Sequence, residues 1–493
     1  MIDPVRVRYA PSPTGNPHVG NIRTAIFNWL FAKHFGGVFV LRIEDTDQNR
    51  KLDGALENIL ESLRWLELGW DEGPEVGGAY GSYFQSERLE IYNKYSEQLL
   101  SNEQAYKCYC SPSRLKDMRL KQQQSKQPIG YDGLCRTDKG QKQALEQNSS
   151  SRPVLRFKTP SDGQSTFIDS IRGEVYFQNS LLDDFVILKS DGYPTYHMAN
   201  VIDDHLMGIT HVLRADEWLS SGSKHLMLYK AFSWEPPVFA HLPIILGKDR
   251  SKLSKRHGAV SILEYRDQGY LPNVMLNFLA LLGWSIDDKT EIISRDDLIR
   301  KFSIERVGKS GAIFDQEKLE WMNGYYIRAM STDKLSAMLA PVIEKSNLTS
   351  KSHPVDRKYL KKVTPLIQER LKTLSEAPQI TEFFFKEELI YDSKDLAKVG
   401  LSSKEIYSRL PQILIHLESL DNFDASNLED LLRSLAVKLT VKPGQLFRCL
   451  RFVFTGRQVS PPLFETMSVI GRTRCLNRLS AVIKLLSDIY SDI

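Results

Sequence analysis

A turn between a strand and a helix near the N-terminus constrains the fold of this chain more than any other feature. Residues 5–9 indicate a short strand, and apolar residues then recur with helical spacing at Ile22, Ala25, Ile26, Trp29 and Leu30. A glycine pair at residues 36–37 ends that helix, and residues 38–43 form a second strand-like apolar run. This order predicts two parallel strands joined by a right-handed crossover, and therefore an α/β fold with a parallel sheet at its core.

The turn itself contains Gly15, His18 and Gly20, and it has the features of a phosphate-binding site. The first amides of a helix and the positive end of its dipole favour an anion, and glycine lets ligand and backbone approach closely. A lone histidine is more often a packed or surface residue. At this turn the context favours a phosphate-binding role for His18.

A second segment far downstream, residues 251–256, carries two lysines and an arginine. Its sequence is Ser251-Lys252-Leu253-Ser254-Lys255-Arg256. Alone it is an ordinary charged loop. Placed after the second half of a parallel sheet, its cations can neutralise a departing pyrophosphate.

Together, in this order, the two segments resemble the HIGH and KMSKS signatures of class I aminoacyl-tRNA synthetases. Further runs narrow the resemblance to glutamyl-tRNA synthetases of the bacterial type: residues 11–15 (Pro-Ser-Pro-Thr-Gly), 42–47, 191–197 and 203–205. The resemblance covers nearly all of residues 3–330 and weakens beyond. This sequence departs from the signatures at Asn21, where the first motif has a second histidine, and at Leu253 and Arg256, where the second has methionine and serine.

Length and composition agree with a soluble chain of several domains. At 493 residues the chain should hold three domains or more. Its longest apolar run, residues 274–284, contains Asn277 and falls far short of the ~20 residues that a membrane span needs. The N-terminus has no secretory pattern, and five cysteines do not make a disulfide framework, so we expect a reducing cytoplasm.

We expect five segments. They are the first half of a Rossmann-type catalytic domain (1–104), an inserted α/β acceptor-binding domain (105–185), the second half of the catalytic domain (186–250), a loop and stem-contact domain (251–329) and an all-helical anticodon-binding region (330–493). Changes in composition mark the boundaries, since clustered cysteines and polar tracts begin after residue 104. Residues 185–189 again have the apolar pattern of a buried strand. The sheet that begins at residue 5 should therefore be completed there and at residues 211–214.

By resemblance, the ligands are glutamate, ATP with Mg2+ and tRNA for glutamate. Charging of tRNA for glutamine as well is the alternative that the sequence leaves open. The residues implied at ATP are Pro11, Thr14, Gly15, His18, Gly20, Asn21, Lys252, Leu253, Ser254, Lys255 and Arg256, with His18, Lys252 and Lys255 in catalytic roles. Those implied at glutamate are Arg8, Ser12, Glu44, Tyr196, Asn200 and Arg214. An arginine fork pairs bidentately with a carboxylate, which agrees with these residue types. A structural ion pair is the alternative for Arg8 and Arg214, and helix capping or surface exposure is the alternative for residues 203–205.

A structural zinc site is a further expectation. Cys108, Cys110 and Cys135 have thiolate spacing suited to zinc. Zinc-bearing relatives take a fourth ligand from a histidine two places after the third cysteine, where this chain has Thr137; Tyr131 stands where a tyrosine serves in some relatives. Buried thiols acting as small hydrophobes are the alternative.

The C-terminal half carries clustered basic residues. Residues 436–464 contain no acidic side chain, and Arg448, Arg451 and Arg457 lie among them. A phosphate backbone would be attracted there, although solvated basic helix faces are common. By resemblance, Arg370 is the candidate that rejects the anticodon of glutamine tRNA, with Arg448 and Arg451 as other anticodon candidates.

These features predict a cytoplasmic glutamate:tRNA ligase, and the family resemblance implies a monomer. A glutaminyl-tRNA synthetase is the close alternative, but that family carries β-barrels where residues 330–493 read as helical. A truncated paralogue that glutamylates a base within tRNA lacks the helical half. The motif residues His18, Lys252 and Lys255 argue against a non-catalytic tRNA-binding protein, and the long basic tail argues against a nucleotidyltransferase for a small cofactor.

Overall fold

The computed structural model describes residues 4–148, 152–254, 261–346, 348, 354–391, 399 and 407–491. The chain divides into two compact units. The first comprises residues 1–266 and 271–316, and the second comprises residues 267–270 and 317–493. The finer division into five segments stays a prediction.

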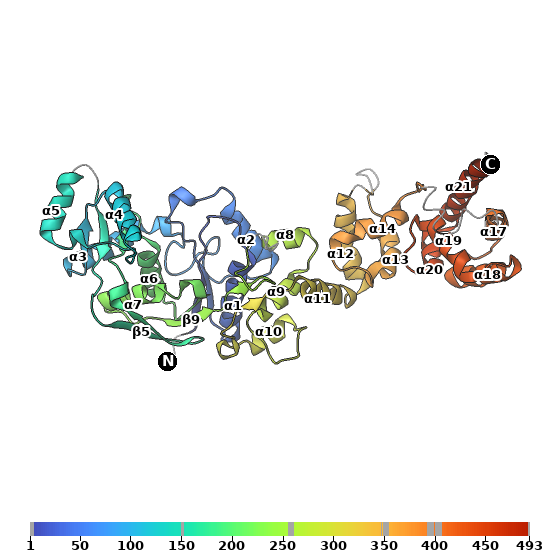
Figure 1. The fold of residues 1–493 in the computed structure, drawn as a ribbon. Coiled ribbons are helices and arrows are strands. Elements are labelled where there is room, and N and C mark those ends of the chain that lie inside the picture. The colour runs from blue at the N-terminus through green and yellow to red at the C-terminus, as the bar shows by residue number, and fades with distance from the viewer. Residues whose placement is uncertain are drawn as a thin grey trace. The chain divides into compact units, whose positions relative to one another are not determined.

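The predicted strand, helix and strand open the first unit (Figure 1). Strand β1 (Arg6–Tyr9) and strand β2 (Val38–Leu41) pair in parallel, and helix α1 (Val19–His34) connects them. Eleven of the 16 residues of α1 are buried, because its apolar side chains pack beneath the sheet. Gly36 follows the helix with a φ of +60°, a conformation that glycine adopts without strain.

A four-stranded sheet continues the core. Its strand order is β6-β5-β9-β8, formed by β5 (Gln164–Asp169), β6 (Gly173–Gln178), β8 (His211–Ala215) and β9 (Val238–Leu242). Strands β8 and β9 are parallel, and β5 meets β9 at the pair Asp169 and Phe239. Thr210, just before β8, bonds to Arg6 of β1 through both backbone and side chain. The carboxyl ends of β1, β8 and β9 therefore lie at one edge, where α/β sheets bind ligands.

The inserted region has its own three-stranded sheet. Strands β3 (Ala105–Cys108), β4 (Val154–Phe157) and β7 (Val186–Leu188) pair antiparallel in that order. Helices α4 (Pro112–Gln124) and α5 (Asp138–Gln147) belong to the same region. The prediction that residues 185–189 complete the core sheet is wrong, because β7 pairs with β4. An apolar run does not specify its partner strand, so the sequence could not exclude this pairing.

The remaining elements of the first unit are short. The strands β10 (Ile245–Leu246) and β11 (Ala312–Ile313) are parallel to each other. The helices are α2 (Ala55–Trp65), α3 (Leu89–Ser101), α6 (Tyr196–Leu206), α7 (Ser221–Phe232), α8 (Ile262–Asp267), α9 (Pro272–Leu281) and α10 (Arg295–Lys301). Single turns of 3-10 helix lie at Gln48–Arg50, Gln85–Glu87, Leu134–Arg136, Asn179–Leu181, Asp216–Trp218 and Ile304–Arg306.

In the described part of the second unit every regular element is a helix, as predicted for the C-terminal half. The helices are α11 (Gln316–Arg328), α12 (Thr332–Lys345), α13 (Arg357–Gln368), α14 (Ala377–Phe385), α17 (Leu410–Glu418), α18 (Ala425–Lys438), α19 (Pro443–Thr455), α20 (Leu463–Ile470) and α21 (Arg472–Ser491), with a 3-10 turn at Leu374–Glu376. None of the helices in the described ranges combines the length and apolarity needed to cross a bilayer.

Candidate active site

His18 stands at the N-terminal end of α1 and caps it. Its Nδ1 atom accepts a hydrogen bond from the backbone N–H of Gly20 at 3.0 Å. Because Nδ1 is an acceptor, the neutral ring carries its proton on Nε2, which can donate to a ligand. A side chain at Gly20 would place its Cβ 2.8 Å from the His18 ring, so glycine leaves the room that this arrangement needs. The N-terminal end of α1 and the Nε2–H donor of His18 can together bind an anion.

The turn before His18 connects this end of α1 to the end of β2. Pro11 is buried, whereas Ser12 and Thr14 are exposed, and the Thr14 amide donates to the Ser12 carbonyl at 2.9 Å. The Glu44 amide donates to the Pro11 carbonyl at 3.0 Å. The turn with the predicted ATP-binding residues is therefore tied to the segment that carries Glu44.

Lys252 lies close enough to His18 to influence its titration. Loss of hydration lowers the pKa of His18. The charge of Glu217 raises this pKa, and the charge of Lys252 lowers it further. The Lys252 ammonium forms an ion pair with the Glu217 carboxylate and remains 63% exposed. Leu253 anchors the segment by donating to the Ile245 carbonyl at 2.9 Å, and Ser254 is exposed. Lys255 and Arg256 lie outside the described residues.

A buried network of charged and polar groups joins three of the predicted glutamate-binding residues, Arg8, Glu44 and Asn200, through Arg42 and Asp204. Arg8 Nε donates to Asp204 Oδ1 at 3.0 Å, and Arg42 contacts the same oxygen at 2.8 Å. Arg42 also bonds to Glu44 Oε1 at 3.1 Å, which accepts from Asn200 Nδ2 at 2.9 Å. Burial raises the pKa of Glu44, although Arg42 and Asn200 oppose the rise. Arg8 therefore forms a structural ion pair through its Nε atom. Its two terminal nitrogens form no hydrogen bond with other described residues.

Arg214, at the end of β8, faces the same region. Its Nη1 donates to the Tyr196 hydroxyl at 3.2 Å, and the Tyr196 ring packs against Trp218 with the ring centres 4.5 Å apart and the planes tilted by 41°. Arg8, Glu44 and Arg214 all influence the pKa of Tyr196, which burial raises. Arg214 Nη2 and Asn200 Oδ1 are buried without a hydrogen-bond partner among the described residues. Buried polar atoms are rarely left so, and the two unpaired atoms among the predicted glutamate-binding residues indicate a polar ligand.

The capping or surface alternative for Asp203 and Asp204 is wrong. Both are buried, at 0% and 2% exposure, and bind Arg88, Arg42 and Arg8. A carboxylate can be buried this way only when cations from distant segments neutralise it, which the local sequence does not reveal. His205 is a surface residue that stacks on Trp234 at 3.8 Å.

Sequence reasoning missed His225 on α7 and His241 on β9, both of which contact Arg214. Asp169 on β5 binds His241 in turn. The one available signal was position: His241 lies near the carboxyl end of a buried strand, where ligand-binding residues gather.

Three cysteines and a tyrosine meet in the inserted region. The thiol atoms of Cys108, Cys110 and Cys135 lie within 4.8 Å of one another, and Cys110 and Cys135 are 3.6 Å apart. The Tyr131 hydroxyl is 3.5 Å from both Cys108 and Cys110. Sulfur atoms about 3.8 Å apart are expected around a tetrahedral zinc with bonds of ~2.3 Å, so the donor set fits that ion. Thr137 instead caps α5, accepting from the Gly140 amide at 3.2 Å.

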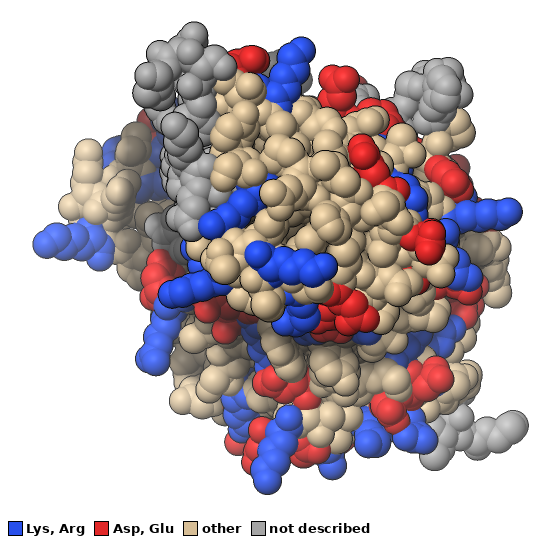
Figure 2. Space-filling view, turned by 90° about the vertical axis from the view of Figure 1, so that its right-hand side faces the viewer, with Lys and Arg blue, Asp and Glu red and all other residues tan. Residues whose placement is uncertain are grey.

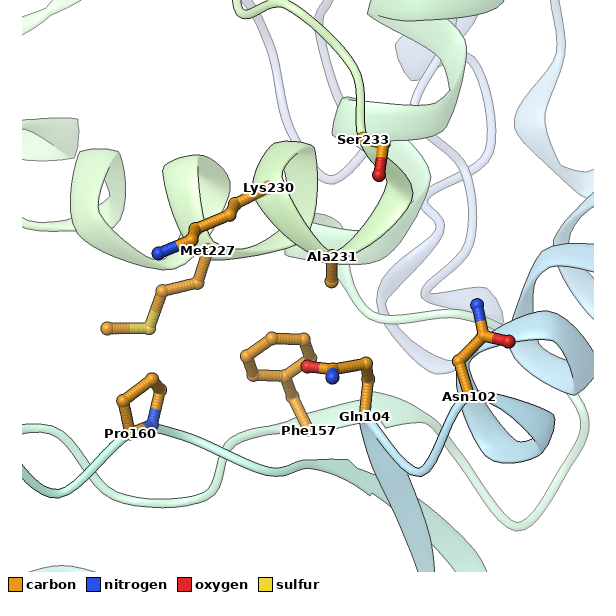
Figure 3. Close-up of a pocket in the computed structure, with 8 residues that line it drawn as sticks. All are labelled: Asn102, Gln104, Phe157, Pro160, Met227, Lys230, Ala231 and Ser233. Carbon is orange, nitrogen blue, oxygen red and sulfur yellow. The ribbon is translucent and has the colours of Figure 1, made fainter.

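A cavity of about 440 Å³ lies elsewhere in the first unit. Figure 3 shows Met227 on α7 pointing toward Pro160, and Gln104 beside the ring of Phe157. None of the predicted site residues lines this cavity. It therefore carries no part of the predicted chemistry.

The basic candidates of the second unit differ in exposure. Arg370, just after α13, and Arg448, on α19, are exposed, whereas Arg451 is half-buried. Arg457 pairs with Glu382 at 3.2 Å, so part of its charge is already neutralised. Figure 2 shows acidic and basic side chains interspersed around a central area of uncharged residues. On that face the basic residues do not form one continuous patch.

Comparison with known proteins gives concordant matches. Residues 4–321 match the family described as tRNA synthetases class I (E and Q), catalytic domain, and residues 334–483 match one described as anticodon binding domain. A glutamate–tRNA ligase of Dehalococcoides mccartyi is 55% identical over 492 residues, which is 100% of both chains. One from Roseiflexus castenholzii is 45% identical, covering 99% of this chain and 98% of the relative. A crystal structure of a glutamate tRNA ligase from Elizabethkingia meningosepticum, in complex with its amino acid, is 35% identical with a TM-score of 0.89, covering 98% of this chain and 100% of that chain.

Proposed function

Because this chain belongs to the class I tRNA synthetases for glutamate and glutamine, we propose that it is a glutamate–tRNA ligase. A carboxylate oxygen of glutamate attacks the α-phosphorus of ATP, the bond to pyrophosphate breaks, and glutamyl-adenylate forms. A hydroxyl of the 3′-terminal adenosine of tRNA then attacks the glutamyl carbonyl, and AMP leaves. ATP enters as its magnesium complex, in which the ion offsets phosphate charge. In this proposal the enzyme is a cytoplasmic monomer.

The observation that supports the proposal is the pair of guanidinium groups, Arg8 and Arg214, which both influence the pKa of Tyr196, together with the unpaired Nη2 of Arg214. In our assignment Arg214, with the Tyr196 hydroxyl, binds one carboxylate of glutamate, and Arg8 binds the other. Glu44 holds the ammonium group, which the open Oδ1 of Asn200 can also accept from, and Ser12 completes the polar lining at the turn. Glutamine is neutral at its side chain, so it leaves a buried guanidinium unpaired and is rejected.

The phosphates lie at the start of α1. His18 donates from Nε2 to phosphate oxygens, and Gly20 and Asn21 present the first amides of the helix. Pro11, Thr14 and Gly15 shape the turn. Lys252 leaves Glu217 and stabilises the negative charge that develops on pyrophosphate, as do Lys255 and Arg256. Leu253 and Ser254 of the same segment complete the ATP site.

ATP–pyrophosphate exchange with the purified chain tests this function. Exchange should depend on glutamate, remain at background with glutamine, and require tRNA for glutamate, because acceptor-end binding completes the site by induced fit. Charging of tRNA for glutamate and tRNA for glutamine is then compared. Activation of glutamine in preference to glutamate would replace this function with the glutaminyl alternative, which the helical second unit disfavours.

A structural zinc ion is proposed at Cys108, Cys110, Cys135 and Tyr131. Bound there, zinc ties the segment after β3 to the turn before α5 and so stabilises the inserted region. Elemental analysis of the purified chain should find close to one zinc per molecule. Changing Cys108 and Cys110 together to serine should remove it.

Cys449→Ser is the matched control, because this buried thiol lies in the second unit, where it contacts the Val399 carbonyl. That variant should keep its zinc. If the wild-type chain binds none, the three cysteines are packing residues and Tyr131 does not complete a site.

Discrimination between tRNAs is proposed at Arg370. The side chain is exposed and forms no ion pair with other described residues, so its fork can contact a base edge. Such a contact discriminates by about 1 to 3 kcal/mol, so Arg370→Gln should raise the relative charging of glutamine tRNA by roughly tenfold. Glutamate activation should not change.

Lys372→Gln serves as the control, because it removes a nearby charge that pairs with Glu320 at 3.5 Å. It should weaken charging of both tRNAs equally. An unchanged ratio in Arg370→Gln would move the discriminating contact to another residue, with Arg448 and Arg451 as the next candidates.

A further inference from the structure

Two histidines from different elements hold the guanidinium of Arg214. Its Nε donates to Nε2 of His241, on β9, at 2.9 Å, and its Nη1 lies 3.2 Å from Nδ1 of His225, on α7. A guanidinium has five N–H donors and no acceptor, so each contacting ring nitrogen must accept. Both histidines are therefore neutral when they bind Arg214.

A third residue fixes the orientation of each ring. His241 Nδ1 lies 2.6 Å from Asp169 Oδ2, and the His241 amide donates to the same oxygen at 3.0 Å. His225 Nε2 lies 3.2 Å from Nδ1 of His197. Because each ring accepts from Arg214 at one nitrogen, its proton is on the other, and that proton is donated to Asp169 or to His197. Burial lowers the pKa of both His225 and His241, and Arg214 adds to the lowering, whereas Asp169 opposes it at His241. The net direction agrees with the neutral rings that the contacts with Arg214 require.

The donors of Arg214 can be counted. Its single Nε–H goes to His241, and the two N–H groups of Nη1 go to His225 and to the Tyr196 hydroxyl. The two N–H groups of Nη2 remain, and this nitrogen is buried without a hydrogen-bond partner among the described residues. The contacts thus use one side of the fork and leave the other open.

The nature of the acceptors matters as well as their position. Arg8 and Arg42 are paired with carboxylates, chiefly Asp204, so much of their charge is neutralised. Within the described residues Arg214 forms no ion pair, and its acceptors are two imidazoles and a phenol. Neutral acceptors orient the guanidinium without cancelling its positive charge, which stays available to an incoming carboxylate.

We propose that His241 and His225 are positioning residues for the amino-acid substrate, which orient Arg214 so that Nη2 meets the glutamate carboxylate with its charge intact. This inference rests on the proposed function, in which Arg214 binds glutamate. Neither histidine touches the substrate. Asp169 and His197 extend the same arrangement by holding the two rings.

Substitutions by asparagine and glutamine test the inference because they reproduce different ring nitrogens. The amide of asparagine lies near the Nδ1 position of a histidine, and that of glutamine lies near Nε2. At residue 241 glutamine keeps the acceptor for Arg214, whereas asparagine loses it. At residue 225 the order is reversed, because the acceptor there is Nδ1.

The measurement is the KM for glutamate in ATP–pyrophosphate exchange. His241→Asn and His225→Gln should each raise it by about 10- to 100-fold, because each removes a hydrogen bond to a charged group. His241→Gln and His225→Asn should raise it much less. The KM for ATP and the kcat at saturating glutamate should change little in all four variants, and their thermal midpoints identify any that fail to fold.

If the histidines had a merely structural role, the asparagine and glutamine variants at each position would have similar KM values for glutamate. That result, or an unchanged KM in all variants, overturns the inference. The wild-type activity would then still support the proposed function. A wild-type chain without glutamate-dependent exchange overturns the proposed function itself. If the substitutions at residue 241 unfold the chain, the pair at residue 225 decides.

Discussion

Arg214→Gln is expected to lower kcat/KM for glutamate by about 30-fold to several thousand-fold, because removing one partner of a buried charge pair costs about 2 to 5 kcal/mol. Arg214 is 4% exposed, and its Nη2 is buried without a hydrogen-bond partner among the described residues. Glutamine at this position can still donate to the phenol of Tyr196 but carries no charge. The loss should therefore fall on the KM for glutamate, while the KM for ATP stays near its wild-type value.

The sharper readout is the ratio of activity with glutamate to activity with glutamine. This ratio should fall, because the substitution removes the buried guanidinium that a neutral side chain would leave unpaired. Arg64→Gln is the control, because that guanidinium pairs with Glu57 and Glu75 on the surface. Should Arg214→Gln keep the wild-type ratio, another residue reads the side-chain carboxylate.

His18→Asn is expected to slow adenylate formation by about 10²- to 10³-fold, the usual effect of removing one donor that stabilises charge in a transition state. Asparagine is a good N-cap residue, so its side-chain oxygen can still accept from the Gly20 amide and the helix should be retained. Only the distal Nε2–H donor is lost. Single-turnover measurement of adenylate formation, with tRNA present, gives the rate.

His18→Ala separates the two roles of this residue. It removes the cap as well as the donor, so it should lose about 1 kcal/mol of stability in addition to the same loss of rate. An unchanged single-turnover rate in His18→Asn would show that the imidazole takes no part in phosphate stabilisation.

The sequence was most informative where the structure depends on local pattern. The β1-α1-β2 order and the helical C-terminal region follow from periodicity, and the meeting of the three cysteines follows from their spacing. Tyr131, which lies beside them, was pointed to by the resemblance. The resemblance also pointed to Arg8, Tyr196 and Arg214, which do lie in one region. Their roles remain predictions.

What the sequence did not reveal depends on contacts between distant segments. Strand β7 has the apolar character of a core strand, and only its pairing with β4 places it in the inserted region. His241 and His225 have no motif, because their role is defined by Arg214, which is 27 and 11 residues away. Asp204 is similar, since its burial depends on Arg8 and Arg42. Such residues are recognisable only once the fold is assembled.

The ion pair between Arg8 and Asp204 has a consequence for how the chain emerges from the ribosome. The two residues are 196 positions apart, so Arg8 is made long before its carboxylate partner exists. At about 5 to 20 residues per second, the delay is on the order of 10 to 40 s. During that time a buried Arg8 would be an uncompensated charge, so β1 must keep this side chain in water. The N-terminal β-α-β segment can form early, but Arg8 can be buried at the end of β1 only after α6, which carries Asp204, has been synthesised.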